Sequence, residues 1–149
     1  MSDLVSICRE AGFARVETYI ASGNVVFESK AIASRVKAEL EARLLAYAGK
    51  PISVFVRTAA EMQAILDANP FPKAEPKYTY AIFLDEPPPP DALAHAVGRN
   101  GEQMHLGERE IFVHYPSGMG RSKLRIPAAG TGTARNMNTV AKLASLASK

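Results

Sequence analysis

The sequence is short of three features: cysteine, long apolar runs and, near its end, acidic residues. Its only cysteine is Cys8, so no disulfide can form within the chain. Its apolar runs are far shorter than the roughly 20 residues that span a bilayer. The first residues lack the basic and then apolar pattern of a signal peptide. Together these absences predict a soluble, cytoplasmic protein without a membrane partner.

The composition predicts one globular domain over residues 1–149, because 47% of the residues are hydrophobic and only 22% are charged. The net charge is +3, but it is unevenly spread. Six cations and no acid follow position 115, so the preceding residues sum to −3. The cations are Arg121, Lys123, Arg125, Arg135, Lys142 and Lys149. Such a surplus predicts either an anionic partner or a solvated tail, and both interpretations stay open.

Hydrophobic periodicity and turn residues predict a mixed sequence of helices and strands. Ser22-Gly23-Asn24 predicts a hairpin turn, and Ser29 is the expected N-cap of the long helix that follows it. The predicted elements are a helix over 4–11, strands over 14–20 and 25–27, a helix over 29–48, a strand over 52–56, a helix over 58–68, a strand over 78–84, a short helix over 92–97, a hairpin of 104–106 with 111–115, and a helix over 133–147.

The order of these elements suggests an internal repeat. The fold class is predicted to be α+β, with two ferredoxin-like βαββα halves at about 1–68 and 77–149 and mostly antiparallel sheets. The halves match if the first gains a strand before Ser2, so we expect that strand to be missing or the recorded start to be late. A sheet without it would expose a pairing edge, which predicts a homodimer.

Three stretches of sequence carry a family resemblance. They are Thr18–Phe27, Asn69-Pro70-Phe71, and Gly132–Val140 with Lys142-Leu143. In order and spacing the chain resembles the domain-of-unknown-function 1697 family of bacterial conserved hypothetical proteins. Members usually carry a further strand ahead of this start, and many have Trp where Met137 stands. The resemblance implies the fold but no activity, since the family has none established.

The sequence offers little support for catalysis. The three histidines are scattered and one cysteine cannot build a thiolate cage, so we expect no metal site. No cofactor motif and no Gly-x-Ser-x-Gly elbow occurs. Cys8 lies on the apolar stripe of the first helix and is expected to be a small buried hydrophobe. The catalytic residues are therefore unknown, and a binding module is favoured over an enzyme.

Two basic stretches are candidate anion sites. In the first, Ser117–Lys123, glycines let backbone N–H groups converge on an anion while Arg121, Ser122 and Lys123 add donors. Its glycine spacing is not that of a Walker A loop, and a plain flexible connection is the alternative. In the second, Arg135, Asn136 and Asn138 stand at the start of the last predicted helix, where N–H groups attract anions. There Thr133 as a cap and the asparagines as structural ties are the alternative.

We therefore expect a binding module for a phosphate-bearing ligand, either a nucleotide or a nucleic acid. One alternative is a transferase or hydrolase acting on a phosphorylated metabolite, which needs a general base that no placed His, Asp or Glu supplies. Another is a protein-interaction or dimerisation module that uses the exposed sheet edge.

Overall fold

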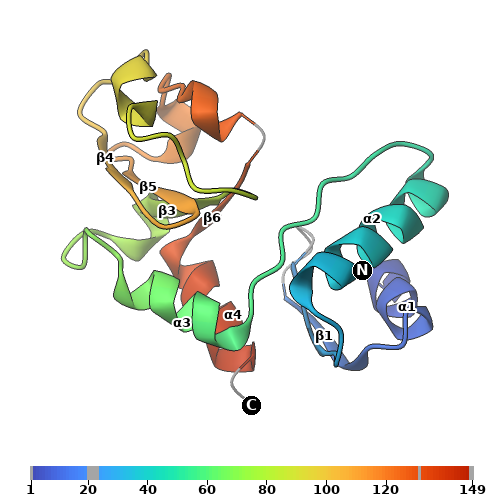
Figure 1. The fold of residues 1–149 in the computed structure, drawn as a ribbon. Helices are drawn as coiled ribbons and strands as arrows, with labels where there is room; N and C mark the ends of the chain where they lie inside the picture. Colours follow the sequence, from blue (N-terminus) through green and yellow to red (C-terminus); the bar gives the residue numbers. More distant parts are fainter. Residues whose placement is uncertain (1, 20–23, 131, 148–149) are drawn as a thin grey trace. The chain divides into compact units, whose positions relative to one another are not determined.

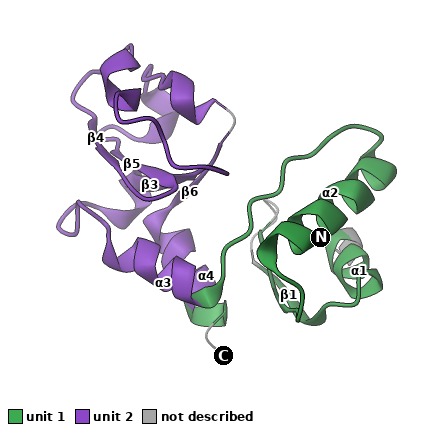
Figure 2. Ribbon diagram, viewed as in Figure 1, with its two compact units in different colours: residues 1–59, 145–149 green, residues 60–144 purple. Residues whose placement is uncertain are grey.

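The structure is a computed structural model that describes residues 2–19, 24–130 and 132–147 (Figure 1). Within these residues it is a mixed α/β fold with four α-helices and antiparallel sheets. The chain divides into two compact units, residues 1–59 with 145–149 and residues 60–144 (Figure 2). The boundary falls within the first predicted half, and a single domain stays a prediction. None of the described helices has the length and apolar character needed to cross a membrane.

The first unit packs two helices against a β-hairpin. Its elements are α1 (Ser2–Glu10), β1 (Ala14–Tyr19), β2 (Asn24–Glu28) and α2 (Ala33–Ala48), with β1 and β2 antiparallel. The hairpin prediction is confirmed, although Ser22 and Gly23 lie outside the described residues. The core is built from Ile7, Cys8, Phe13, Val36 and Leu40. Burial raises the pKa of the Cys8 thiol, which agrees with its predicted role as a small hydrophobe.

The predicted N-cap of the long helix is wrong. The cap position is Ile32, which makes no side-chain cap hydrogen bond, and α2 begins at Ala33. The Ser29 hydroxyl instead accepts the N–H of Ala31 at 3.1 Å, because a serine can bond two residues ahead in a turn of its own. The predicted end is confirmed, since Gly49 takes the left-handed conformation at φ +74°.

No strand forms over residues 52–56. Val54 and Val56 pack against the core of the first unit, which satisfies their apolar alternation without a neighbouring strand. The N–H of Val54 donates to a carboxylate oxygen of Glu41 at 3.0 Å, and Lys37 holds the same oxygen at 2.6 Å. These contacts, the Lys37 hydrogen bond first, lower the pKa of Glu41. The alternation of apolar residues over 52–56 therefore reflects packing against the core. The Glu41 side chain accepts the Val54 N–H in place of a neighbouring strand.

The second unit is a four-stranded antiparallel sheet with the order β4-β5-β3-β6. Four short 3₁₀ helices, η1 to η4, lie in its loops. The elements are α3 (Ala59–Asp67), η1 (Pro76–Tyr78), β3 (Thr79–Phe83), η2 (Ala92–His95), β4 (Gln103–Leu106), β5 (Glu110–His114), η3 (Met119–Arg121), η4 (Pro127–Ala129), β6 (Thr133–Asn136) and α4 (Met137–Ala147).

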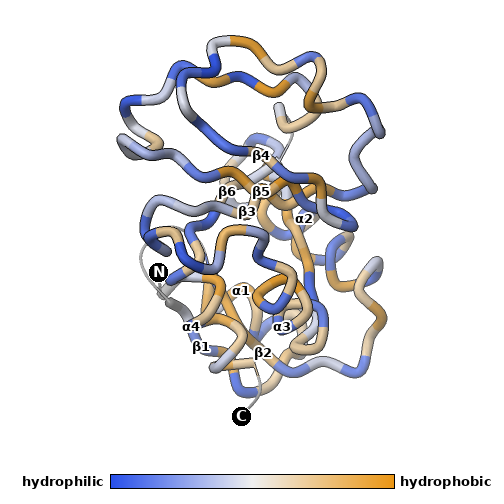
Figure 3. The backbone as a smooth tube through the Cα atoms, turned by 90° about the vertical axis from the view of Figure 1, so that its left-hand side faces the viewer, coloured by the Kyte–Doolittle hydropathy of each residue, from blue (hydrophilic) through white to orange (hydrophobic). Residues whose placement is uncertain are grey.

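Both faces of this sheet are covered (Figure 1). Helices α3 and α4 lie on one side, whereas the loops that carry η2 and η4 lie on the other. The hydrophobic residues of β5, coloured orange in Figure 3, are all fully buried because they alternate between the two covered faces. On the loop side, Ile82, Ile111, Val113 and Ala134 pack with Ile126 in one cluster.

Two predicted helices of the second unit are present but shorter than predicted. Residues 92–97 hold only the four-residue η2, and the last helix begins at Met137, not Thr133. Residues 133–136 form β6 because β3 offers a free edge, with Thr133 opposite Phe83. Gly132 allows this approach, since a Cβ there would lie 2.6 Å from the Phe83 carbonyl oxygen.

Candidate anion-binding surface

The loop that follows β5 is tied down by one buried carboxylate. Glu102 is only 5% exposed, and it accepts the N–H of Asn100 and the hydroxyl hydrogen of Ser122, the latter at 2.9 Å. The Ser122 oxygen in turn accepts the N–H of Leu124 at 3.1 Å. Ser122 was predicted to donate to an anion, but its hydroxyl donates to Glu102 and fixes the loop.

A two-residue bridge aligns this loop with the segment before β4. Val97 and Arg125 exchange two backbone hydrogen bonds of 2.8 Å in antiparallel orientation. Gly98 makes the approach possible, because its φ is +75° and an added Cβ would collide with the carbonyl of Lys123. The bridge brings residues 97–99 beside residues 123–125 although more than 20 positions separate them in sequence.

Four exposed cations lie on these two aligned segments or within two residues of them. We call them the basic surface: Arg99, Arg121, Lys123 and Arg125. Across the described ranges 2–19, 24–130 and 132–147, none of the four forms an ion pair. The Nε of Arg99 donates to the main-chain oxygen of Glu102 at 2.7 Å, which uses one donor of the guanidinium of this exposed residue.

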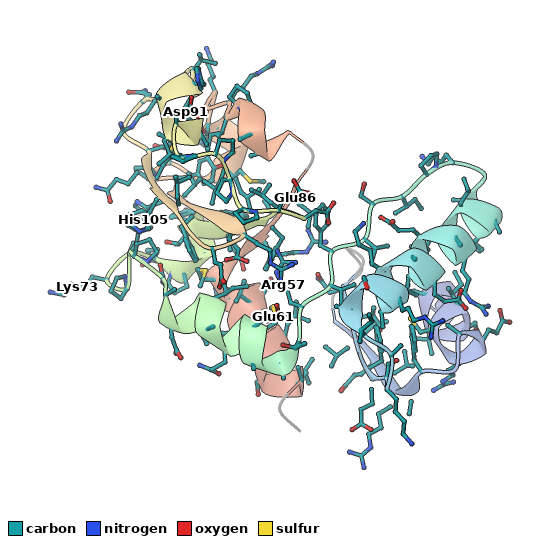
Figure 4. The ribbon with its side chains drawn as sticks, in the orientation of Figure 1. Arg57, Glu61, Lys73, Glu86, Asp91 and His105 are labelled. Atoms are coloured by element: carbon teal, nitrogen blue, oxygen red, sulfur yellow. The ribbon has the colours of Figure 1, made fainter. Side chains whose placement is uncertain are left out.

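Two acids accompany the basic surface. Glu102 lies beneath it and is buried. Asp91, labelled beside η2 in Figure 4, is exposed and lies 3.1 Å from the Nε2 of His95. The Glu102 carboxylate is held by Asn100 and Ser122 and its charge also interacts with Arg99, whereas Asp91 contacts His95. An anion that meets the surface therefore encounters four positive charges, one buried carboxylate held by local donors, and the exposed Asp91.

The second predicted group lies elsewhere in the unit. One terminal nitrogen of Arg135 donates to the Thr133 hydroxyl at 3.1 Å and to the Ala134 carbonyl at 2.8 Å. Burial lowers the pKa of this guanidinium. Asn136 caps α4, since its side-chain oxygen accepts the N–H of Thr139 at 2.9 Å. Asn138 is exposed on the first turn of α4.

The structure does not bring the two groups together. Ala134 packs into the cluster on the loop side of the sheet, together with Leu124 and Ile126. Because side chains alternate along a strand, Arg135 faces the opposite side, toward the helices. One face of the sheet is therefore covered by the loop that carries Arg121, Ser122 and Lys123, and Arg135 lies on the other face.

Sequence reasoning missed the acid that organises this surface. Glu102 and Ser122 stand 20 positions apart, and nothing local marks them as partners. The N–H of Asn100, followed by the Ser122 hydroxyl, lowers the pKa of Glu102 despite burial. A general base works best with a pKa near neutrality, so this lowered pKa makes Glu102 a poor base for phosphoryl chemistry. Burial, then the charge of Glu102, raises the pKa of the nearby Tyr115 phenol.

Comparison with known proteins identifies a family. Residues 1–112 match the family described as "protein of unknown function (DUF1697)". The chain belongs to the DUF1697 family. This confirms the resemblance of the sequence, although the DUF1697 match ends before the loop that carries Arg121 and Lys123.

A solved structure shares the fold of this DUF1697 chain. It is that of a conserved bacterial protein from Streptococcus pneumoniae, with a TM-score of 0.80 and 21% sequence identity. The similarity covers 100% of this chain and 89% of that chain. At this identity the likeness shows the fold alone. No curated protein matches the chain.

The residues that the structure describes contain no candidate metal site. Within those ranges, no three His, Cys, Asp or Glu side chains gather in a group that could hold a metal ion.

Proposed function

We propose that residues 60–144 form a binding module for a phosphate-bearing ligand, a nucleotide or a nucleic acid. The observation that carries this proposal is the bridge between Val97 and Arg125, which aligns two basic segments. Arg121 and Lys123 supply charge to the ligand, whereas Ser122 positions them through Glu102. The tethers fix the backbone that carries these cations, so binding orders less backbone than it would in a free loop.

Binding of labelled nucleotides and oligonucleotides at several salt concentrations tests this proposal. The double variant Arg121→Gln with Lys123→Gln should weaken binding about tenfold or more and reduce the salt slope by about two, one for each lost phosphate contact. Lys142→Gln is the matched control, because Lys142 is an exposed cation of the same acid-free segment but lies on α4. The double variant removes two charges and Lys142→Gln one, so an equal loss of binding free energy per removed charge would point to net charge alone and would contradict a defined site.

Other parts of the sequence prediction stand as proposals of the same kind. The duplicated ferredoxin-like arrangement is one, and it is supported by the antiparallel order of the four-stranded sheet. A cytoplasmic location is another, since a single buried thiol suits a reducing compartment. Homodimerisation is the third: within the described residues, β1 and β2 pair only with each other, which leaves their outer edges open. The mass in solution tests it, and a strict monomer would contradict it.

A further inference from the structure

An aromatic side chain lies at one end of the basic surface. The chain turns back after β5, where the N–H of Tyr115 donates to the Tyr78 carbonyl at 2.8 Å and the N–H of Gly118 donates to the Tyr115 carbonyl at 3.0 Å. A Cβ on Gly118 would lie 3.5 Å from the Tyr78 ring. The ring of Tyr78 is half-buried and borders the turn that leads into Arg121.

Cationic and apolar groups surround this ring. The ammonium of Lys77 lies 5.0 Å from the centroid of the Tyr78 ring, so a cation already occupies one approach to it. Met119, one residue after Gly118, is 43% exposed. At the other end of the surface, Val97 is 57% exposed beside Arg125. Apolar and aromatic side chains from three separate segments of the chain thus lie beside the cations.

We infer that the ligand is a single-stranded nucleic acid, with one base stacked on Tyr78 and its phosphates on Arg121 and Lys123; this rests on the proposed function. An inorganic polyphosphate would use the cations and leave the aromatic and apolar groups without a partner. A duplex keeps its bases stacked inside. Unpaired nucleotides offer both phosphates and base faces to such a surface, and a single strand offers several of each.

The extent of the surface sets the length of the ligand. Residues 118 to 123 span at most about 18 Å when extended, and the bridge at Val97 continues the surface beyond them. A strand of several nucleotides can contact Tyr78 and the bridged segments at the same time, whereas a mononucleotide has fewer groups with which to contact them. Affinity should therefore rise from one nucleotide to an oligonucleotide of about ten, a length within the usual range for single-strand sites.

Fluorescence anisotropy of the full chain tests this inference with four probes: a labelled single strand of about ten nucleotides, its blunt duplex, a labelled mononucleotide, and inorganic polyphosphate as competitor. The single strand should bind about tenfold more tightly than either the duplex or the mononucleotide. Tyr78→Leu should remove about tenfold of that affinity while leaving the salt slope unchanged, because stacking involves no counterion. Tyr78→Phe should keep wild-type affinity.

Three results would overturn the inference. Equal binding of single strand and duplex would do so, as would an unchanged affinity in Tyr78→Leu; in both cases the phosphate-binding function would still stand. If the wild-type chain binds none of the four probes, both proposals fall. Thermal unfolding shows whether Tyr78→Leu is folded. If it is not, Val97→Ser and Met119→Ser take its place, and a single-strand affinity unaffected by either substitution contradicts the inference.

Discussion

Two stretches of the second unit look alike in sequence and differ in structure. Residues 117–123 and 133–138 are both basic and acid-free, with small polar residues beside the cations. In the first stretch Arg121 and Lys123 are exposed, since the backbone forms a loop and the side chains project to the surface. In the second, Arg135 belongs to a strand and bonds along its own backbone.

The difference lies in what holds each backbone in place. Pairing with β3 fixes residues 133–136, so side chains there serve the sheet and the helix cap. The loop of residues 117–123 has no ladder and depends on Glu102, on the bridge at Arg125 and on a glycine that permits the bridge. A cationic side chain is available to a ligand where other residues hold the backbone in place and the cation itself makes no structural contact.

The largest expected effect comes from closing the space at Gly98. Gly98→Ala forces a side chain into a left-handed conformation and into the Lys123 carbonyl, so the bridge must open. We expect the free energy of unfolding to fall by about 3 kcal/mol, as measured by urea denaturation, and oligonucleotide binding to weaken with it.

The control for this variant lies in the same loop. A Cβ at Gly120 would meet no atom within 4 Å, so Gly120→Ala should change stability by less than about 0.5 kcal/mol. If the two variants were equally stable, the close approach at Gly98 would not hold the loop.

A smaller effect, tied to pH, is expected at Glu102. Its folded-state pKa is lowered, so its contribution to stability is present above the ordinary glutamate pKa and lost as the pH falls through the lower folded value. Glu102→Gln should therefore unfold at a lower urea concentration than wild type at pH 7. The gap should begin to narrow as the pH falls below the ordinary glutamate pKa of about 4.3, and it should close only at more acid pH. Glu108→Gln, an exposed acid in the hairpin turn, should behave as wild type at both pH values; a gap that persisted in acid would assign the effect to packing.

Some features of the fold could be predicted from the sequence and others could not. The β4–β5 hairpin, the end of α2 at Gly49 and the buried Cys8 follow from local periodicity and turn chemistry. The strand over 133–136 could not be predicted, because its apolar and polar pattern is also helical and the edge of β3 decided the outcome. The role of Glu102 was hidden because it depends on Ser122, which only the folded chain brings near.

The smallest expected effect on stability is in residues 133–138, where Asn136 caps α4 and Asn138 is an exposed amide. Asn136→Ala removes the acceptor for the Thr139 N–H, which should cost about 1 kcal/mol of unfolding free energy. Asn138→Ala, two residues later and exposed, should change stability by less than about 0.5 kcal/mol. Neither change should alter oligonucleotide affinity, because both residues lie outside the basic surface. If Asn138→Ala weakened binding tenfold at unchanged stability, the start of α4 would be the anion site, and the contrast between the two stretches would reverse.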